Sequence, residues 1–405
     1  MSASELRIAV IGAGIVGSCI ALALQKRGAS ATLIDRDEPG SGCSFGNSGA
    51  ISESSVAPMA MPGVLAAVPR MLLDRESPLH LPPYYWLKAA PWLMRFVASA
   101  TPAGVAASSA RLAALHAGAG DGHEALAGEV GVPELLLRRG HLHLYPDARA
   151  LAKDASGWRL RERHGHRVER LDRAGILALE PHVGERYQVG VFMPDHATIL
   201  NPFRYVQAIA AAFAARGGDV RRAGVESLAP LADGRWQLAP DDRTAAALPA
   251  FDRVVVAAGA WSGRLLEPLG VRLALESQRG YHVQFQGARE TVSRTVVLAD
   301  RKVFVTPMEQ GLRVGGMVEI GGLERPPDAR RTLLLERFAR ETFQGLDGLE
   351  VARWMGHRPC MPDSVPVIGP CAEQPGLWLA VGHGHLGLTE SVNTAQRIAD
   401  GMFRP

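Results

Sequence analysis

The start of the chain alternates apolar runs with a helical pattern. Residues 7–11 form a short apolar run of the kind found in buried parallel strands. An Ala- and Leu-rich stretch then predicts a helix that continues to Lys26 and is ended by Gly28. A second apolar run, residues 31–34, predicts a strand that stops at Asp35. Together these elements predict a βαβ unit of roughly 30 residues.

The same parallel-sheet pattern returns later in the chain. Asn201 is a predicted N-cap, Pro202 suits the first helical position, and Gly217 marks the end of this helix. Buried strands are predicted over residues 220–225, 251–259 and 377–382. We therefore expect segments that are far apart in the sequence to share one parallel sheet.

A different pattern occupies the middle of the chain. Residues 279–318 alternate and turn as antiparallel strands do, so we place them in a layer separate from the parallel sheet. The basic stretch 159–173 has the pattern of a solvated helix face broken by a glycine, and we assign it no function. The other predicted elements are strands over residues 138–144 and 189–193, a β-meander near Trp236, and a helix near residues 333–343.

Two early segments are unusual in composition. Residues 40–55 hold so many Gly and Ser residues that we expect an extended loop of the kind that approaches ligands. Residues 56–125 hold many prolines and are predicted to form a helical insertion. Two interpretations of its aromatic residues stay open: packing on their own domain, or contact with a membrane or a partner subunit. These aromatic residues are Tyr84, Tyr85, Trp86, Trp92 and Phe96.

Length and charge narrow the class of protein. The chain has 405 residues and 47% apolar content, and its length exceeds the ~250 to 300 residues at which single cores usually split into domains. The 44 Lys and Arg residues nearly balance the 41 Asp and Glu residues, and no dense basic run is interleaved with aromatics, so we expect no nucleic-acid partner. No signal-peptide pattern and no apolar run of about 18 residues is present. The predicted location is cytoplasmic, with at most a peripheral membrane contact.

Cysteine and histidine spacing gives little support for a metal. The four cysteines, Cys19, Cys43, Cys360 and Cys371, lie far apart without a C-x-x-C pair, which fits a reducing compartment. His383 and His385 flank a single glycine and are a candidate metal pair, but no acidic or Cys ligand stands beside them. We therefore expect no metal.

The strongest local motif follows the first strand. Gly12, Gly14 and Gly17 match G-x-G-x-x-G between a strand and a helix, where glycines permit a tight turn and close approach of a pyrophosphate. Asp35 stands about 20 residues later, as expected for an acidic residue that bonds a ribose hydroxyl. The motif predicts a dinucleotide site, and by itself it leaves NAD and FAD equally open.

Other segments resemble the D-amino-acid oxidase family of flavoproteins, especially its bacterial D-amino-acid dehydrogenase-like branch. The resemblance runs almost from end to end, and it lies in the order and spacing of the segments. They are VIGAGIVG with LIDRD, GCSFGNSGAIS, VVVAAGAWS, RGYHV, VTPMEQGLRVGG, HRPCMPDSVPVIG and VGHGHLGLTES. The resemblance implies FAD as cofactor and an oxidoreductase that acts on an amino acid.

The resemblance also implies which residues bind the cofactor. Asp35 would hold the adenosine ribose, Val225 would lie near the adenine, and the run after Gly382 would wrap the pyrimidine edge of the flavin. Helix amides near Leu388 would stabilise the negative charge of the reduced flavin. The full set is Gly12, Gly14, Ile15, Val16, Gly17, Asp35, Arg36, Ser44, Asn47, Gly49, Ala50, Ile51, Val225, Ala258, Gly259, Gly356, Gly382, His383, Gly384, His385, Leu386, Gly387, Leu388 and Thr389.

For the substrate, Arg358 in G-H-R-P matches the carboxylate-binding arginine of the family. A planar guanidinium binds a carboxylate with two parallel hydrogen bonds and so orients the substrate. Tyr281, His282 and His385 are further catalytic candidates, and Thr306 is a further candidate for substrate contact; plain sheet packing is an equal alternative for Tyr281, His282 and Thr306. We expect the FAD to be bound non-covalently, because Gly356 stands where sarcosine oxidase relatives carry the attaching cysteine.

The predicted fold is α/β: a Rossmann-like, doubly wound FAD-binding domain with a discontinuous antiparallel-sheet substrate domain. Residues 1–55, 200–268 and 355–405 form the first domain, and residues 56–199 and 269–354 form the second. The predicted reaction oxidises a D-amino acid, or a cyclic imino acid such as D-proline or D-hydroxyproline, to an imino acid and then a keto acid plus ammonia. Alternatives are a glycine- or sarcosine-type oxidase that produces hydrogen peroxide, a flavoprotein subunit of a hetero-oligomeric dehydrogenase, and an NAD-dependent dehydrogenase. The acceptor is a quinone, an electron-transfer partner or oxygen, and an oligomer is compatible with the sequence.

Overall fold

The computed structural model describes residues 6–62, 77–242 and 248–403. Its first elements are β1 (Arg7–Ile11), α1 (Ile15–Lys26) and β2 (Ser30–Asp35). β1 and β2 pair in parallel, which confirms the predicted βαβ unit. β1 is flanked on its other side by β13 (Arg253–Val256), so strands from distant parts of the sequence meet at the glycine-rich turn.

The first sheet has the strand order β10-β2-β1-β13-β20-β19. Its pairs are parallel except the pair formed by β19 and β20. The strands not yet bounded are β10 (Asp219–Arg222), β20 (Leu377–Val381) and β19 (Val367–Pro370). Helices α1, α9 (Pro202–Ala215) and α12 (Gly387–Phe403) pack in one apolar cluster with inward-facing side chains of this sheet. The opposite face packs against β11 (Val225–Pro230), β12 (Trp236–Pro240) and α10 (Ser262–Leu266). This layering is the predicted doubly wound arrangement.

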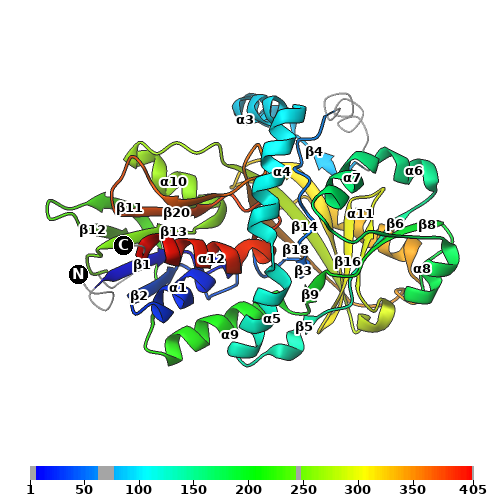
Figure 1. Cartoon of the computed structure of the whole chain (residues 1–405), viewed down its shortest axis with the longest axis horizontal. Helices are drawn as coiled ribbons and strands as arrows, with labels where there is room; N and C mark the ends of the chain where they lie inside the picture. Colours follow the sequence, from blue (N-terminus) through cyan, green and yellow to red (C-terminus); the bar gives the residue numbers. More distant parts are fainter. Residues whose placement is uncertain (1–5, 63–76, 243–247, 404–405) are drawn as a thin grey trace.

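The second sheet lies at the other end of the molecule (Figure 1). Its strand order is β18-β14-β17-β16-β15-β6-β8-β7, with β4 beside β17. Neighbours are antiparallel except for β15 with β6 and β17 with β4. The strands are β18 (Val351–Cys360), β14 (Glu276–Gln286), β17 (Gly311–Ile320), β16 (Val303–Met308), β15 (Thr295–Leu298), β6 (His141–Tyr145), β8 (Val189–Met193), β7 (Glu169–Leu171) and β4 (Leu79–His80). Helix α11 (Ala329–Thr342) covers β14 and β17 from one side.

Helices and a small sheet connect these two layers. The described part of the predicted insertion is helical, with α3 (Trp86–Ser99), α4 (Pro102–His116) and α5 (Ala119–Glu129), whereas residues 63–76 lie outside the described residues. α4 and α5 pack on α12, and α4 runs through the middle of the molecule in Figure 1. The remaining elements are β3 (Ala50–Ile51), β9 (Ala197–Ile199), β5 (Leu136–Leu137), α6 (Ala148–Lys153), α7 (Ala155–Arg163) and α8 (Arg173–Leu179), together with single turns of 3-10 helix.

Four local predictions are corrected by the structure. The basic stretch 159–173 is only partly helical, because α7 ends at Arg163 and β7 follows, pairing with β8. The strand predicted over residues 220–225 is two strands, since β10 ends at Arg222 and Val225 begins β11. The loop 40–55 contains β3, and the strand predicted over residues 138–144 begins only at His141, where β6 starts, while β5 ends at Leu137 before the predicted range. Local patterns missed these breaks because tertiary pairing set them.

Among the described residues, no helix combines the length and the apolar character needed to cross a bilayer. All four cysteines carry free thiols. The division of the chain into two domains at the predicted boundaries stays a prediction.

Candidate active site

Three glycines shape the turn between β1 and α1. Gly12 has a left-handed φ of 106°, and a Cβ there would lie 2.4 Å from the carbonyl oxygen of Ala257. A Cβ at Gly17 would lie 1.8 Å from the carbonyl oxygen of Gly12, so α1 packs on the turn at a separation that only glycine permits. Gly14 is the N-cap of α1. The turn and the positive end of α1 thus have the geometry of a pyrophosphate-binding turn.

The carboxylate of Asp35, at the end of β2, ties this turn together. Its Oδ2 accepts a 2.7 Å hydrogen bond from the amide of Ala13, and its Oδ1 accepts one of 3.0 Å from the amide of Asp37. Burial raises the pKa of Asp35 above its ordinary value, and the two amides oppose that shift. Asp35 therefore has a structural role in addition to its predicted contact with a ribose.

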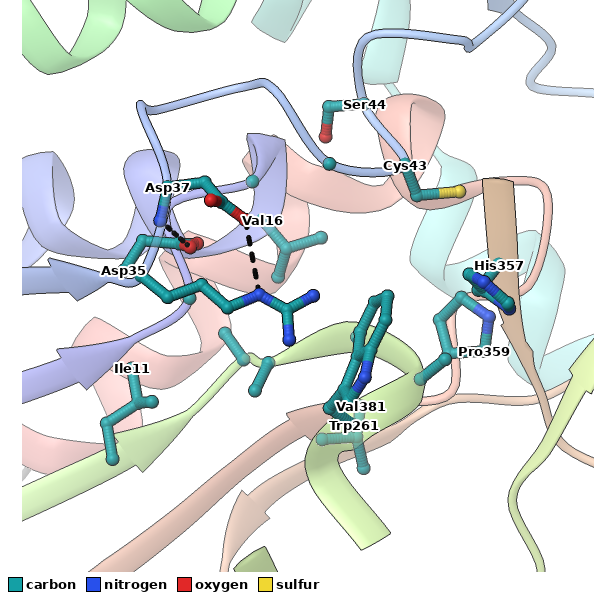
Figure 2. A pocket seen from close by; sticks show the side chains of 18 of the residues that line it. Ile11, Val16, Asp35, Asp37, Cys43, Ser44, Trp261, His357, Pro359 and Val381 are labelled. Atoms are coloured by element: carbon teal, nitrogen blue, oxygen red, sulfur yellow. Dashed lines mark hydrogen bonds and ion pairs between the residues drawn. The ribbon is translucent and has the colours of Figure 1, made fainter. Parts of the chain in front are cut away.

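A cavity of about 530 Å³ opens at the carboxyl ends of β1, β2, β13 and β20. Figure 2 shows Asp35 and Asp37 on one side of it and Trp261, His357 and Pro359 on the other. The structure brings most of the predicted cofactor residues to its wall: Gly12, Gly14, Ile15, Val16, Asp35, Arg36, Ser44, Asn47, Val225, Ala258, Gly259, Gly382, His383, Gly384, Gly387 and Leu388. Ligands of open α/β sheets bind at this edge.

The other predicted cofactor residues are not among those that line the cavity. Thr389 is fully buried, and its hydroxyl accepts from the amide of Ser52 at 3.1 Å and bonds the carbonyl of Ala50 at 3.3 Å. This contact fixes the loop that follows β3 to the first turn of α12. The predicted residues outside the lining are Gly17, Gly49, Ala50, Ile51, Gly356, His385, Leu386 and Thr389.

Several lining residues were not predicted. The guanidinium of Arg36 lies 4.3 Å from the ring centroid of Trp261, and that ring meets His357 edge-on at 5.2 Å, so a row of flat groups borders the cavity. Trp261 belongs to the quoted segment VVVAAGAWS, and His357 begins the quoted segment HRPCMPDSVPVIG. Their place in these segments was the sequence signal that could have identified them. Glu226 of β11, Arg264 of α10, and Asp241 and Asp242 after β12 also line the cavity, and they gave no such signal because none of them belongs to a quoted segment. Cys43 also lines the cavity.

The loop after β2 is held from both sides. The hydroxyl of Ser44 accepts a 3.0 Å hydrogen bond from the amide of Ile15, at the start of α1. On the other side Arg313 of β17 donates to the carbonyl oxygens of Phe45 (2.9 Å) and Asn47 (2.7 Å). Burial lowers the pKa of Arg313 to about 10. This buried cation fixes the loop that carries the lining residues Ser44 and Asn47.

Arg358 is held beside the cavity by a bulge in β17. Its Nη1 donates to the carbonyl oxygen of Met317 at 2.7 Å, and its Nη2 donates to that of Gly316 at 3.3 Å. Met317 has φ 63°, and the register between β14 and β17 shifts at this point. Arg358 does not line the cavity itself, although its neighbours His357 and Pro359 do. Its charge partly offsets the effect of burial, which raises the pKa of the lining thiol Cys43.

Two of the other substrate candidates, His282 and Tyr281, lie on opposite faces of β14. His282 shares a face with the loop, since its Nδ1 lies 3.2 Å from the carbonyl oxygen of Gly46. Tyr281 points to the opposite face, where its hydroxyl bonds Glu319 and its ring joins the apolar cluster under α11. Thr306 is fully buried, and its hydroxyl has no hydrogen-bond partner among the described residues. The placement of Tyr281 gives no support to a substrate contact.

The two histidines of the H-G-H triplet lie in different surroundings. His383 is buried and bonds the hydroxyl of Thr394 at 3.0 Å, whereas His385 is exposed. In the described parts of the chain, no group of three His, Cys, Asp or Glu residues is arranged to hold a metal ion.

Comparison with protein families decides the class of this site. A model described as FAD-dependent oxidoreductase matches residues 7–401. The chain belongs to this family of FAD-dependent oxidoreductases. The match covers both sheets and every segment that contributes to the cavity, so the oxidoreductase carries FAD as its cofactor.

Relatives of this oxidoreductase have matching lengths. It is 36% identical to a D-amino-acid oxidase of Bradyrhizobium diazoefficiens, over 97% of the chain and 94% of the relative. It is 34% identical to D-amino acid dehydrogenase 2 of Ralstonia nicotianae, over 98% of the chain and 97% of the relative. The crystal structure of glycine oxidase from Geobacillus kaustophilus shares the fold, with a TM-score of 0.74, 21% identity, and coverage of 98% of this chain and 95% of that one.

The cavity of the oxidoreductase has features that suit FAD. The missing side chains of Gly12 and Gly17 leave a narrow turn at the positive end of α1, which suits a pyrophosphate. Asp35 stands at the end of β2 next to that turn. The cavity then continues past Trp261 toward Gly382 and Gly387 at the start of α12. One part of the cavity thus suits the ADP half of FAD, and the other part suits its flavin ring.

Proposed function

We propose that this protein oxidises the carbon–nitrogen bond of a small amino acid, either a D-amino acid or a cyclic imino acid such as D-proline or D-hydroxyproline. A primary D-amino acid gives an imino acid, which water hydrolyses to a keto acid and ammonia, whereas a cyclic imino acid gives a cyclic imine whose nitrogen stays in the product. The names of the relatives at 36% and 34% identity support this substrate class. A glycine- or sarcosine-type oxidase, or a subunit of a hetero-oligomeric dehydrogenase, uses the same site and is the alternative.

The observation that carries the proposal is the position of Arg358. Its hydrogen bonds in the described chain go to the uncharged carbonyl oxygens of Gly316 and Met317, so its charge remains to be neutralised by an anion. Burial lowers the pKa of the guanidinium below its ordinary value, but an arginine keeps its proton at neutral pH. A carboxylate bound there would lie next to the cavity residues Cys43, His357 and Pro359.

The protein residues supply binding and orientation. The chemistry that FAD would supply when bound is acceptance of a hydride from the substrate carbon. Arg358 would fix the carboxylate by two parallel hydrogen bonds, which lowers the entropic cost of a productive geometry. Gly387 and Leu388, at the N-terminal end of α12, line the cavity, so the helix amides there favour negative charge. No strong base is required in this arrangement.

Flavin reduction without oxygen tests the proposed function directly. The purified protein is mixed anaerobically with glycine, sarcosine, D-alanine, D-proline, D-hydroxyproline and larger D-amino acids, and the loss of flavin absorbance is followed. We expect bleaching with at least one of them and not with the corresponding amines that lack a carboxylate. Absence of bleaching with every amino acid would contradict the proposal.

The electron acceptor and a membrane contact form the finer part of the proposal. Next to and along α3, Tyr84, Trp86, Leu87 and Met94 expose 63%, 50%, 90% and 67% of their surface. Lys88 and Arg95 are exposed on the same helix. We propose that this face meets an anionic membrane from the cytoplasmic side and that a quinone is the acceptor. Binding to anionic vesicles, and dye reduction faster than peroxide formation, are the expected results; peroxide at the same rate would indicate an oxidase.

A further inference from the structure

Two glycines face each other where β14 and β18 pair. Gly280 and Gly356 are Cα partners in this antiparallel ladder, with Arg358 two residues from Gly356 on one side and Trp354 two residues from it on the other. Alternation along a strand puts Trp354, Gly356 and Arg358 on one face of the sheet. This face is shared by His282, which pairs with Trp354.

Each glycine is covered by one flat side chain. A Cβ at Gly280 would lie 2.1 Å from Cζ of Arg358, so the guanidinium lies directly on that glycine. A Cβ at Gly356 would lie 2.0 Å from Cη2 of Trp354, so the indole lies on the partner glycine. Paired positions in an antiparallel ladder are about 4.5 to 5.5 Å apart. The guanidinium and the indole therefore lie next to each other on the surface of two paired glycines, where the strands carry no side chains.

The indole of Trp354 is fixed in this position. A Cβ at Gly46 would lie 1.9 Å from its Cζ3, so the ring is enclosed between the loop and β18. The ring of His282 stacks on it at 5.1 Å with an interplanar angle of 18°. Burial lowers the pKa of His282 to about 3, so the wall formed by the stacked rings of Trp354 and His282 is uncharged at neutral pH.

We infer that Trp354 determines substrate size, by setting an upper limit on the side chain of the amino acid whose carboxylate binds Arg358. This inference rests on the proposed function. A carboxylate bound to the guanidinium above Gly280 would place the substrate carbon about one strand spacing from Gly356. The indole of Trp354 already covers Gly356. Hydrogen and methyl substituents, and the ring of a cyclic imino acid, fit that interval. Leucine- and phenylalanine-sized side chains meet the indole.

The test compares Trp354→Ala and Trp354→Phe with the wild type. The kcat/KM for D-alanine, D-leucine and D-phenylalanine is measured from anaerobic flavin reduction. We expect Trp354→Ala to raise the ratio of D-phenylalanine to D-alanine by about tenfold or more, as a site enlarged by several methylenes does. Trp354→Phe should give an intermediate ratio. A ratio that stays within about twofold of wild type in both variants would overturn the inference.

Binding of carboxylates that cannot be oxidised gives a second readout. The Kd values of acetate and phenylacetate are measured from the perturbation of flavin absorbance, and Trp354→Ala should tighten phenylacetate relative to acetate. Trp158→Phe, in a separate apolar cluster around Tyr145, is the matched control and should change neither ratio. If Trp354→Ala loses FAD, the same two ratios measured in Trp354→Phe test the inference. Wild-type protein that no amino acid reduces would contradict the proposed function, while the two carboxylates would still test the wall.

Discussion

The guanidinium of Arg358 bonds the carbonyl oxygen of Met317, a residue whose φ of 63° lies in the left-handed region. A non-glycine residue held there costs about 1 to 3 kcal/mol, so this conformation persists only where the surrounding structure holds it. Met317 is buried in the apolar cluster under α11, which holds the bulge in place. The position of the arginine thus depends on the packing of a neighbouring strand as well as on β18.

Replacing Arg358 should separate substrate binding from cofactor binding. A charge-assisted hydrogen bond contributes about 1.5 to 3 kcal/mol, and each 1.4 kcal/mol is a factor of ten. Arg358→Ala should lower kcat/KM for amino acids by about tenfold to several hundredfold while FAD content is kept. Arg358→Lys should recover only part of this loss, because an ammonium group has no planar fork. Near-wild-type kcat/KM in Arg358→Ala, or a loss confined to FAD content, would make the arginine structural.

Gly280→Ala should produce a milder defect of the same kind. The added methyl group would collide with the far end of the Arg358 side chain and not with backbone, so the guanidinium should move and the fold should be kept. We expect KM to rise several-fold with little change in melting temperature. Gly287→Ala, just beyond β14, adds a methyl group in open space and measures the cost of a positive φ alone. Equal kinetic effects of the two variants would argue against the contact.

Asp35→Ala should weaken FAD binding and loosen the glycine-rich turn. The substitution removes the acceptor of two amide hydrogen bonds and the predicted ribose partner. The Kd for FAD, measured by titration of the apoprotein, should rise by about tenfold or more. Asp233→Ala, an exposed carboxylate that bonds Arg235, is the control. An unchanged Kd in Asp35→Ala would contradict the assignment of this end of the cavity to the adenosine.

Buried histidines should make the protein sensitive to mild acid. Burial lowers the pKa of His123 and His141 to about 4, whereas each titrates near 6.5 in an unfolded chain. Between these values the unfolded chain binds more protons, so stability is complete above pH 6.5 and falls as the pH approaches 4. Each histidine contributes a slope of up to about 1.4 kcal/mol per pH unit.

Urea unfolding at pH 7 and pH 5 measures this slope. His123 bonds the hydroxyl of Tyr205 and the carbonyl of Leu388, so His123→Gln is the informative variant and should lose less stability between the two pH values than wild type. The surface substitution His182→Gln controls for the removal of one histidine. Equal losses in wild type and His123→Gln would contradict the linkage.

The parts of the fold that could be predicted are those in which local pattern and tertiary packing agree. Residues 7–11 are a strand in both, and Asn201 caps α9 by accepting a hydrogen bond from the amide of Arg204. The break between Arg222 and Val225 was missed because one strand pairs with β2 and the other with β12. Such choices depend on partners that are distant in the sequence.

The site shows the same division. Motif spacing placed Gly12, Gly14 and Asp35 at a cavity, because a short βαβ unit fixes their positions locally. It missed Trp354, whose role depends on which residue β14 places opposite it and on the absence of a side chain at Gly46. It also named Tyr281, which alternation turns to the far side of the sheet.

The first sheet is built from β1, β13 and β20 side by side, and α12 closes the cavity with Gly387 and Leu388. A ribosome delivers these pieces in an order that leaves the cavity open until the segment around residue 388 has emerged. FAD must then be acquired after translation. Until that point the amino-terminal strands lack their carboxy-terminal neighbours in the sheet. Flavin supply should therefore limit the yield of active protein, and a chain cut before α12 should be recovered colourless.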